Sequence, residues 1–167
     1  KRVIGIKIAP HKMNMREYIE QQISALNDLI RINKDRIAGY RKRMETTPEE
    51  DLEQLTSGMI YQSYQHIEEL TDNIYQLGGK PARPDIMSGK FYHSWTDLKA
   101  FIFKETRKKM LDYCKFCEDV VKAIYQKAFD AQELHWDKRG AALLQKHLHD
   151  VEGSYHHVLM LKRGFAS

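Results

Sequence analysis

The stretch IEQQISALNDLIRINKDRIAGYRKRM, residues 19–44, decides the fold of this chain. Its apolar residues recur in alternating steps of four and three, the spacing that puts side chains on one face of an α-helix. The stripe consists of Ile19, Ile23, Leu26, Ile30, Asn33, Ile37, Tyr40 and Met44. Asn33 therefore lies in the middle of an apolar seam, where an aliphatic side chain costs less free energy.

Two further stripes repeat this rhythm. One consists of Leu111, Cys114, Glu118, Val121, Tyr125 and Ala128. The other consists of Leu144, His147, Val151, Ser154, Val158 and Leu161. Glu118 interrupts its stripe as Asn33 interrupts the first. Long helices that each have one apolar face predict an all-α bundle in which these faces form the core.

Helix start and stop signals divide the chain clearly. They predict long helices over residues 15–46, 48–77, 106–132 and 138–163. Asn14 followed by Glu17 makes a capping box for the first helix. Thr47, Pro48 and Glu50 supply a cap hydroxyl, a first-turn proline and a carboxylate three residues after the cap for the second. The short turn between these two helices predicts an antiparallel hairpin.

One long connection follows, because Gly78 and Gly79 end the second helix. It runs to about residue 105 and contains a short amphipathic helix from Phe91 to Ile102. A hairpin, a long crossover and a second hairpin predict an antiparallel four-helix bundle that occupies residues 14–167.

Composition narrows the functional class. The 167 residues carry a formal net charge of +4, with both signs scattered along the helices, which is typical of a solvated surface. No stretch approaches the length of a membrane span, and no recognition-helix pattern accompanies the basic clusters. We therefore expect a cytoplasmic protein that binds no nucleic acid. The chain begins at Lys1, so a removed leader stays open.

The N-terminal segment, residues 1–13, has a different pattern. Ile4, Ile6 and Ile8 alternate with Gly5 and Lys7, as in a β-strand, but the sequence offers no second strand. An isolated strand edge tends to pair with another chain. We therefore predict an extended arm that mediates self-association or binds a protein partner.

Several segments resemble a bacterial ferritin-like four-helix-bundle family of unknown function. They are LNDLIRINKDRIAGY (26–40), YQSYQHIEEL (61–70), LGGKPARP (77–84), SWTDLKA (94–100) and CEDVVKAIY (117–125). The resemblance implies a ferritin-like fold and leaves the activity open.

Ferritin-like dimetal proteins take one Glu from each of two helices and a Glu-x-x-His pair from each of the other two. On this chain the resemblance places these positions at Asn33, Glu118, Ser63-x-x-His66 and Glu152-x-x-Tyr155. His66, Glu118 and Glu152 retain ligand chemistry, and Asn33, Ser63 and Tyr155 become polar neighbours. Asn33, His66, Glu118 and Tyr155 are expected to converge at mid-height inside the bundle.

Two interpretations of these residues stay open. In the first they form a hydrogen-bonded core without a cofactor, in a non-catalytic structural or interaction module. In the second His66, Glu118 and Glu152 hold one iron, manganese or zinc ion. A dimetal oxidase is disfavoured, because two carboxylates do not balance two divalent cations.

Small residues inside the predicted helices have packing explanations. Cys114 and Cys117 form a C-x-x-C within a helix, where free cysteine usually fills core space. Gly39, Gly58 and Gly153 each cost about 1 kcal/mol relative to alanine in a helix, and close helix packing would account for them.

Overall fold

A computed structural model describes residues 13–45, 49–83 and 106–164 of the chain. The helices in these ranges are α1 (Met15–Met44), α2 (Glu50–Gln76), α4 (Arg107–Asp130), the 3-10 helix η1 (Gln132–Leu134) and α5 (Lys138–Arg163). The described residues contain no β-strand. The predicted all-α class is confirmed, and the long helices differ from the predicted ranges only at their ends.

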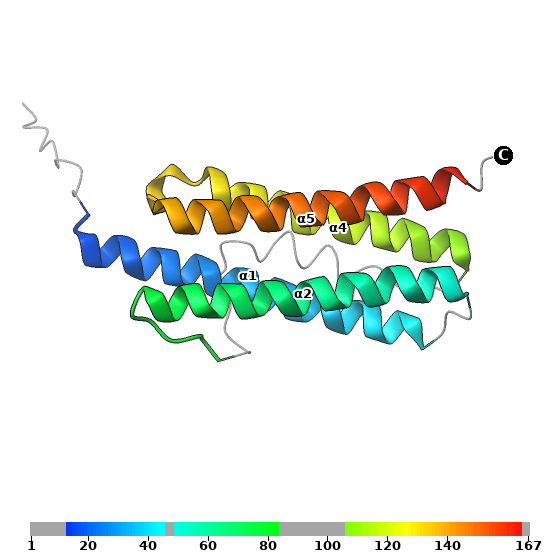
Figure 1. Ribbon diagram of the computed structural model, residues 1–167, viewed down its shortest axis with the longest axis horizontal. Coiled ribbons are helices and arrows are strands. Elements are labelled where there is room, and N and C mark those ends of the chain that lie inside the picture. The colour runs from blue at the N-terminus through cyan, green and yellow to red at the C-terminus, as the bar shows by residue number, and fades with distance from the viewer. Residues whose placement is uncertain (1–12, 46–48, 84–105, 165–167) are drawn as a thin grey trace, which may run out of the picture.

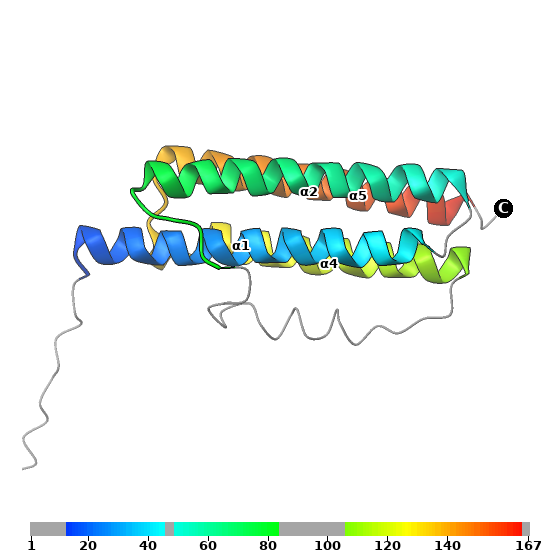
Figure 2. The ribbon, with the colours of Figure 1, turned by 90° about the horizontal axis from the view of Figure 1, so that it is seen from below.

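The long helices form two antiparallel hairpins packed side by side (Figure 1). α1 pairs with α2, and α4 pairs with α5. Across the two hairpins, α1 packs on α4 and α2 packs on α5. Figure 2 shows α2 and α5 on one side of the bundle and α1 and α4 on the other. This is the expected antiparallel four-helix bundle.

The starts of the first two helices differ in how they are capped. The Asn14 side chain accepts the backbone N–H of Glu17, and the Glu17 carboxylate accepts the backbone N–H of Asn14, so the predicted capping box is confirmed. α2 begins with Glu49 as its N-cap, and that residue makes no capping bond through its side chain. Thr47 and Pro48, the expected start, lie outside the described residues.

A tertiary contact holds the beginning of α2 in place. Arg107, at the first position of α4, donates from Nη1 to the carboxylates of Glu49 and Asp51. The bond to Asp51 Oδ1 measures 2.8 Å. The beginning of α2 is therefore tied to the beginning of α4, which joins the two hairpins at one end of the bundle.

Two glycines end α2. Gly78 has a φ of +79°, a left-handed conformation in which a side chain is strained. Its N–H bonds to the carbonyl of Tyr75, and the N–H of Gly79 bonds to that of Ile74, which is the Schellman pattern. A Cβ on Gly79 would lie 2.5 Å from Ile23 Cδ1, so the chain leaves α2 in close contact with α1.

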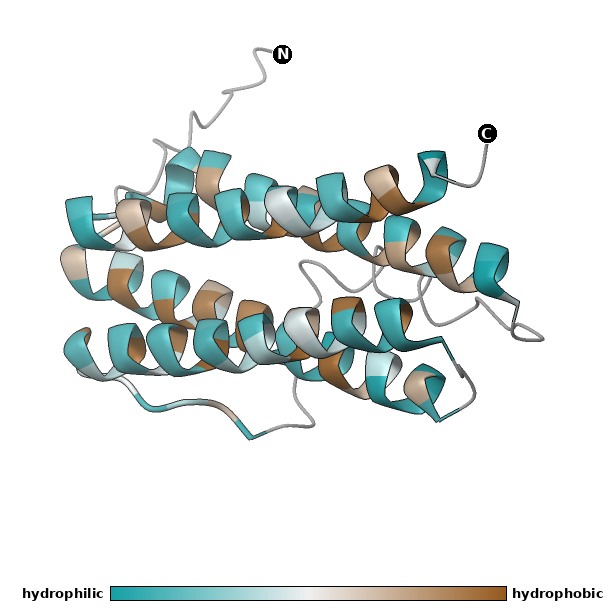
Figure 3. Ribbon diagram, turned by 45° about the vertical axis from the view of Figure 1, so that its right-hand side comes forward, coloured by the Kyte–Doolittle hydropathy of each residue, from teal (hydrophilic) through white to brown (hydrophobic). Residues whose placement is uncertain are grey.

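The predicted stripes form the core, and their hydrophobic residues are coloured brown on the ribbon in Figure 3. Leu26, Leu70, Val121 and Leu144, one from each long helix, are fully buried. Burying such a side chain contributes about 1.5–3 kcal/mol. Gly39 fits close packing between α1 and α4, because a Cβ there would lie 2.4 Å from Tyr113 Oη.

Cys114 and Cys117 are free, fully buried and part of the same core. Burial raises the pKa of both thiols, that of Cys117 to about 12. Both are therefore protonated at neutral pH, and a protonated thiol is a poor nucleophile and metal ligand. Their placement agrees with a packing role.

Two expected features lie outside the described residues. These are the arm, of which residues 1–12 are not described, and the short helix from Phe91 to Ile102. Among the helices that the structure does describe, none is long and apolar enough to cross a membrane.

Candidate functional site

The centre of the bundle holds a buried ion pair between α1 and α4. The Arg36 and Glu118 side chains are both 0% exposed. Arg36 donates from Nε to Glu118 Oε1 over 2.9 Å and from Nη2 to Oε2 over 2.6 Å, so the contact is bidentate. Tyr40 donates its hydroxyl hydrogen to Oε1 over 2.6 Å. Both carboxylate oxygens of Glu118 are therefore occupied by donors from α1.

Side chains of α2 satisfy the rest of the Arg36 guanidinium. Nη1 donates to Ser63 Oγ and to Gln62 Oε1, and Nη2 donates to Gln62 Oε1, each over 3.0 Å. Every N–H of the guanidinium is thereby used. Burial disfavours the charge, but the attraction of Glu118, its hydrogen bonds and the proximity of Tyr40 and Cys117 together outweigh that effect and raise the pKa of Arg36 above its usual value. We call Arg36, Tyr40, Gln62, Ser63 and Glu118 the ion-pair layer.

A second polar layer lies next to it and consists of Asn33, His66, Tyr125 and His147, all fully buried. Asn33 Nδ2 donates to the Tyr125 hydroxyl oxygen over 2.7 Å. That hydroxyl lies 3.2 Å from His147 Nδ1, and His147 Nε2 lies 2.7 Å from Glu69 Oε2 at the rim of the bundle. This histidine layer therefore draws one residue from each long helix and links the core to the surface.

The two imidazoles of the histidine layer stack face to face. The ring centroids of His66 and His147 are 3.8 Å apart, with an interplanar angle of 14°. His66 Nε2 lies 3.1 Å from Asp150 Oδ2. Burial, and then the proximity of His147, lower the pKa of His66 to about 2. Burial also lowers the pKa of His147, against the opposing effect of Glu69. Both rings are neutral at neutral pH.

The structure brings four of the six predicted site residues into the interior. Asn33 and His66 lie in the histidine layer, and Ser63 and Glu118 lie in the ion-pair layer, all at 0% exposure. These four side chains thus meet inside the bundle, but in two adjacent layers and on three helices.

Glu152 and Tyr155 lie elsewhere, which corrects the expected convergence of Tyr155 with the buried residues. Both are partly exposed. The Tyr155 ring lies beside α4, with the Nζ atoms of Lys115 and Lys122 at 5.4 and 4.5 Å from its centroid. The reason is helical phase. Glu152 and Tyr155 lie five and eight residues after the buried His147, so they are turned about 140° and about 80° away from it around the helix axis.

Five residues of the two layers were not assigned to the site from the sequence: Arg36, Tyr40, Gln62, Tyr125 and His147. Tyr40, Tyr125 and His147 belong to the predicted stripes, and their polar atoms were the signal that could have identified them. Arg36 lies one turn after Asn33, on the same side of α1. A long cationic side chain at that spacing is normally solvated, so the sequence gives no sign that its charge is buried.

The donor set around Glu118 does not fit a metal centre as it is folded here. Its oxygens accept three hydrogen bonds, and the Arg36 charge beside them repels a cation. Within the described ranges, no group of three or more His, Cys, Asp or Glu side chains is arranged to hold a metal ion.

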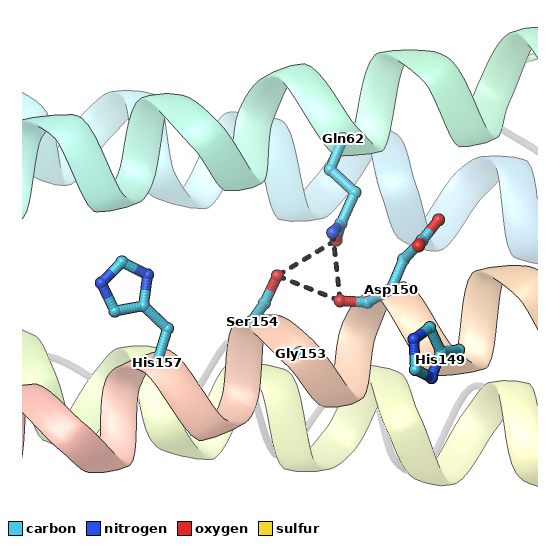
Figure 4. Close-up of a pocket in the computed structure, with 6 residues that line it drawn as sticks. All are labelled: Gln62, His149, Asp150, Gly153, Ser154 and His157. Carbon is cyan, nitrogen blue, oxygen red and sulfur yellow. Dashed lines mark hydrogen bonds between the residues drawn. The ribbon is translucent and has the colours of Figure 1, made fainter.

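A polar hollow of about 340 Å³ opens on the face between α2 and α5 (Figure 4). Its lining residues are Gln62, His149, Asp150, Gly153, Ser154 and His157. Gln62 Nε2 donates to the Asp150 carbonyl over 3.1 Å, and Ser154 Oγ donates to Gln62 Oε1 over 3.3 Å. Gln62 therefore connects the hollow with the ion-pair layer.

Solved structures with the same fold are ferritin-like. The bacterioferritin of Desulfovibrio desulfuricans, which has a diiron site, superposes with a TM-score of 0.70 at 16% identity, covering 90% of this chain and 82% of that one. A ferritin-like diiron-carboxylate protein from Bacillus anthracis gives 0.64 at 19% identity, covering 89% and 99%. The expected ferritin-like fold is confirmed.

The sequence of the chain matches a protein family. No curated protein matches the chain significantly. The profile of the family described as Domain of unknown function (DUF2383) matches residues 21–131, a range that covers most of α1 and all of α2 and α4. The chain therefore belongs to the DUF2383 family.

Proposed function

We propose that this protein is a non-catalytic, metal-independent ferritin-like bundle that serves as a structural or interaction module. The observation that carries the proposal is the Arg36–Glu118 pair, fully buried at the centre of the bundle. The guanidinium supplies inside the protein the positive charge that a carboxylate in an apolar core requires. With that charge present, the bundle needs no bound cation to neutralise Glu118.

Exposed aromatic side chains support the interaction part of the proposal. Tyr61, Tyr64 and Tyr75 are 65%, 45% and 58% exposed on α2. Tyrosine combines a large apolar ring with a hydroxyl that hydrogen-bonds, which is why it is enriched at protein interfaces. α2 therefore offers exposed aromatic contact surface on the outside of the bundle.

Metal binding is the alternative function. Both structural relatives are diiron proteins. In this chain the alternative would use His66, Glu118 and Glu152 to hold one iron, manganese or zinc ion, and it requires Glu118 to leave Arg36. Glu152 would also have to turn inward from its partly exposed position.

Elemental analysis separates the two functions. We expect protein purified without chelator to contain far less than one equivalent of iron, manganese or zinc, because Glu118 has no free oxygen to offer. Addition of each metal should leave the thermal unfolding temperature unchanged. Near-stoichiometric metal that disappears in both Glu118→Gln and His66→Asn, but not in the exposed control His157→Asn, would establish the alternative.

The N-terminal arm remains a proposal for how the module associates. We expect deletion of residues 1–10 to lower the apparent mass on gel filtration, because an unpaired strand of alternating Ile4, Ile6 and Ile8 favours pairing between chains. The full chain at the same concentration is the control. An unchanged mass would remove the arm from the proposal and leave the bundle as it is.

A further inference from the structure

Two buried acceptor atoms in the histidine layer have no hydrogen-bond partner among the described residues. They are Asn33 Oδ1 and His66 Nδ1. Both side chains belong to residues at 0% exposure, so bulk water does not reach them. Leaving a buried polar atom unpaired costs about 1–3 kcal/mol, and such atoms in folded proteins usually bind an internal water or another small species.

The hydrogen-bond partners establish that both atoms are acceptors. Asn33 Nδ2 faces the Leu29 carbonyl at 2.9 Å, which can only accept, so the amide nitrogen is on that side and Oδ1 is on the other. His66 Nε2 faces the Asp150 carboxylate and carries the ring hydrogen. Nδ1 of the neutral ring therefore presents a lone pair.

Helix register places the two residues that carry these atoms in the same layer. Arg36 on α1 contacts Ser63 on α2, and the two helices are antiparallel. Asn33 lies three residues before Arg36, and His66 lies three residues after Ser63, so they face each other one turn along the pair. Both also contact Tyr125, Asn33 through its hydrogen bond and His66 with ring centroids 5.9 Å apart.

The neighbouring donors are already committed. The Tyr125 hydroxyl hydrogen points to His147 Nδ1, because His147 Nε2 needs its own hydrogen for the Glu69 carboxylate. Each N–H of Arg36, in the adjacent layer, already bonds to Glu118, Ser63 or Gln62. The donor hydrogens of Tyr125, His147 and Arg36 are therefore used elsewhere and do not reach Asn33 Oδ1 or His66 Nδ1.

We propose that Asn33 Oδ1 and His66 Nδ1 form an internal site for one small neutral molecule with two donor hydrogens, which in the isolated protein is a water molecule. Two lone pairs on neighbouring helices require two donated hydrogens, and water has two. A cation would also satisfy lone pairs, but the uncancelled charge would lie beside the Arg36 guanidinium. A neutral donor avoids that repulsion. This site goes beyond the proposed module function and does not depend on it.

A high-resolution crystal structure of the full chain, combined with ¹⁷O relaxation dispersion in solution, tests the site. The probe is water itself, and the dispersion counts waters that stay bound long enough to tumble with the protein. We expect one electron-density peak within hydrogen-bond distance of both atoms, without anomalous signal. Asn33→Leu should lose one long-lived water. Asn73→Leu, which removes another buried amide with an unpaired Oδ1, is the matched control, and its crystal structure should retain the electron-density peak at Asn33 and His66.

If Asn33→Leu does not fold, a chemical shift measured on the unmodified chain still tests the site. The ¹⁵N chemical shift of His66 Nδ1 should be that of an unprotonated nitrogen that accepts a hydrogen bond. A shift typical of a free lone pair, or a crystal structure in which the two atoms are dry, would overturn this inference and leave the ion-pair layer untouched. A peak with the anomalous signal of a metal would overturn it together with the metal-independent function.

Discussion

At the scale of single residues, Arg36 and Glu118 depend on each other. Each is charged and fully buried, and each has its strongest partner in the other. Removing one member of such a pair leaves an uncompensated charge in the core, which costs about 3–5 kcal/mol. Replacing both members with neutral groups removes the charge and the penalty together. The pair therefore fixes how α1 meets α4 more than it adds net stability.

This mutual dependence predicts strong coupling in a double-mutant cycle. We expect Glu118→Gln and Arg36→Gln each to lower the free energy of unfolding by about 3–5 kcal/mol, and the double variant to cost much less than their sum. Urea denaturation at neutral pH measures all four proteins. Arg31→Gln, at a partly exposed ion pair on the same helix, is the control and should cost under about 1 kcal/mol. Additive losses would mean that the pair is not a unit.

At the scale of helices, three glycines differ in their surroundings. A Cβ on Gly39 would collide with Tyr113, so close packing explains it. Gly58 and Gly153 have open space where a Cβ would lie, which corrects the packing explanation for these two. Nothing within the described bundle offsets their helical cost.

The difference predicts opposite effects of one substitution. Gly58→Ala and Gly153→Ala should each raise the free energy of unfolding by about 0.5–1 kcal/mol, because alanine loses less backbone entropy in a helix. Gly39→Ala should lower it, since the new methyl group lies 2.4 Å from Tyr113 Oη. Thermal unfolding of the three variants gives the signs directly. Destabilisation by Gly153→Ala would indicate that another surface packs against α5.

The helices could be predicted from the sequence because their signals are local. The stripe spacing identified the buried faces, and Asn14 with Glu17 marked the start of α1 as the structure has it. The same spacing also predicted that Asn33 and Glu118 lie in the interior, as the structure has them. The partner of Glu118 did not follow, because it depends on the register between α1 and α4, which no local pattern contains. Tyr155 was assigned to the site by motif spacing, although the stripe of α5 already indicated that the buried face of this helix is the one that carries His147.

At the scale of the whole molecule, the stacked histidines make stability depend on pH. In the folded state His66 and His147 have pKa values below the ordinary 6.5, while in the unfolded chain they return to it. Between the two values the unfolded chain binds protons that the folded protein does not, so acid favours unfolding. The contribution of the two neutral histidines to the free energy of unfolding is therefore fully present above about pH 6.5, and it is lost as the pH falls below that value.

The size of the effect can be estimated for His66. Its pKa of about 2 when folded implies a loss of about 2 kcal/mol between pH 7 and pH 5. We expect His66→Asn to show a smaller loss over that interval, measured by urea denaturation at both pH values. His157→Asn, at an exposed histidine of α5, should lose as much free energy of unfolding between pH 7 and pH 5 as the parent protein. Equal losses in all three proteins would show that the carboxylates and not His66 set the acid sensitivity.

The side chain of Gln62 has two roles in this bundle. The same amide forms part of the wall of the hollow and accepts two hydrogen bonds from Arg36. Gln62 therefore lies between the hollow and the buried charge of Arg36. We expect Gln62→Leu to leave both Nη atoms of Arg36 without that acceptor and to lower the free energy of unfolding for this reason.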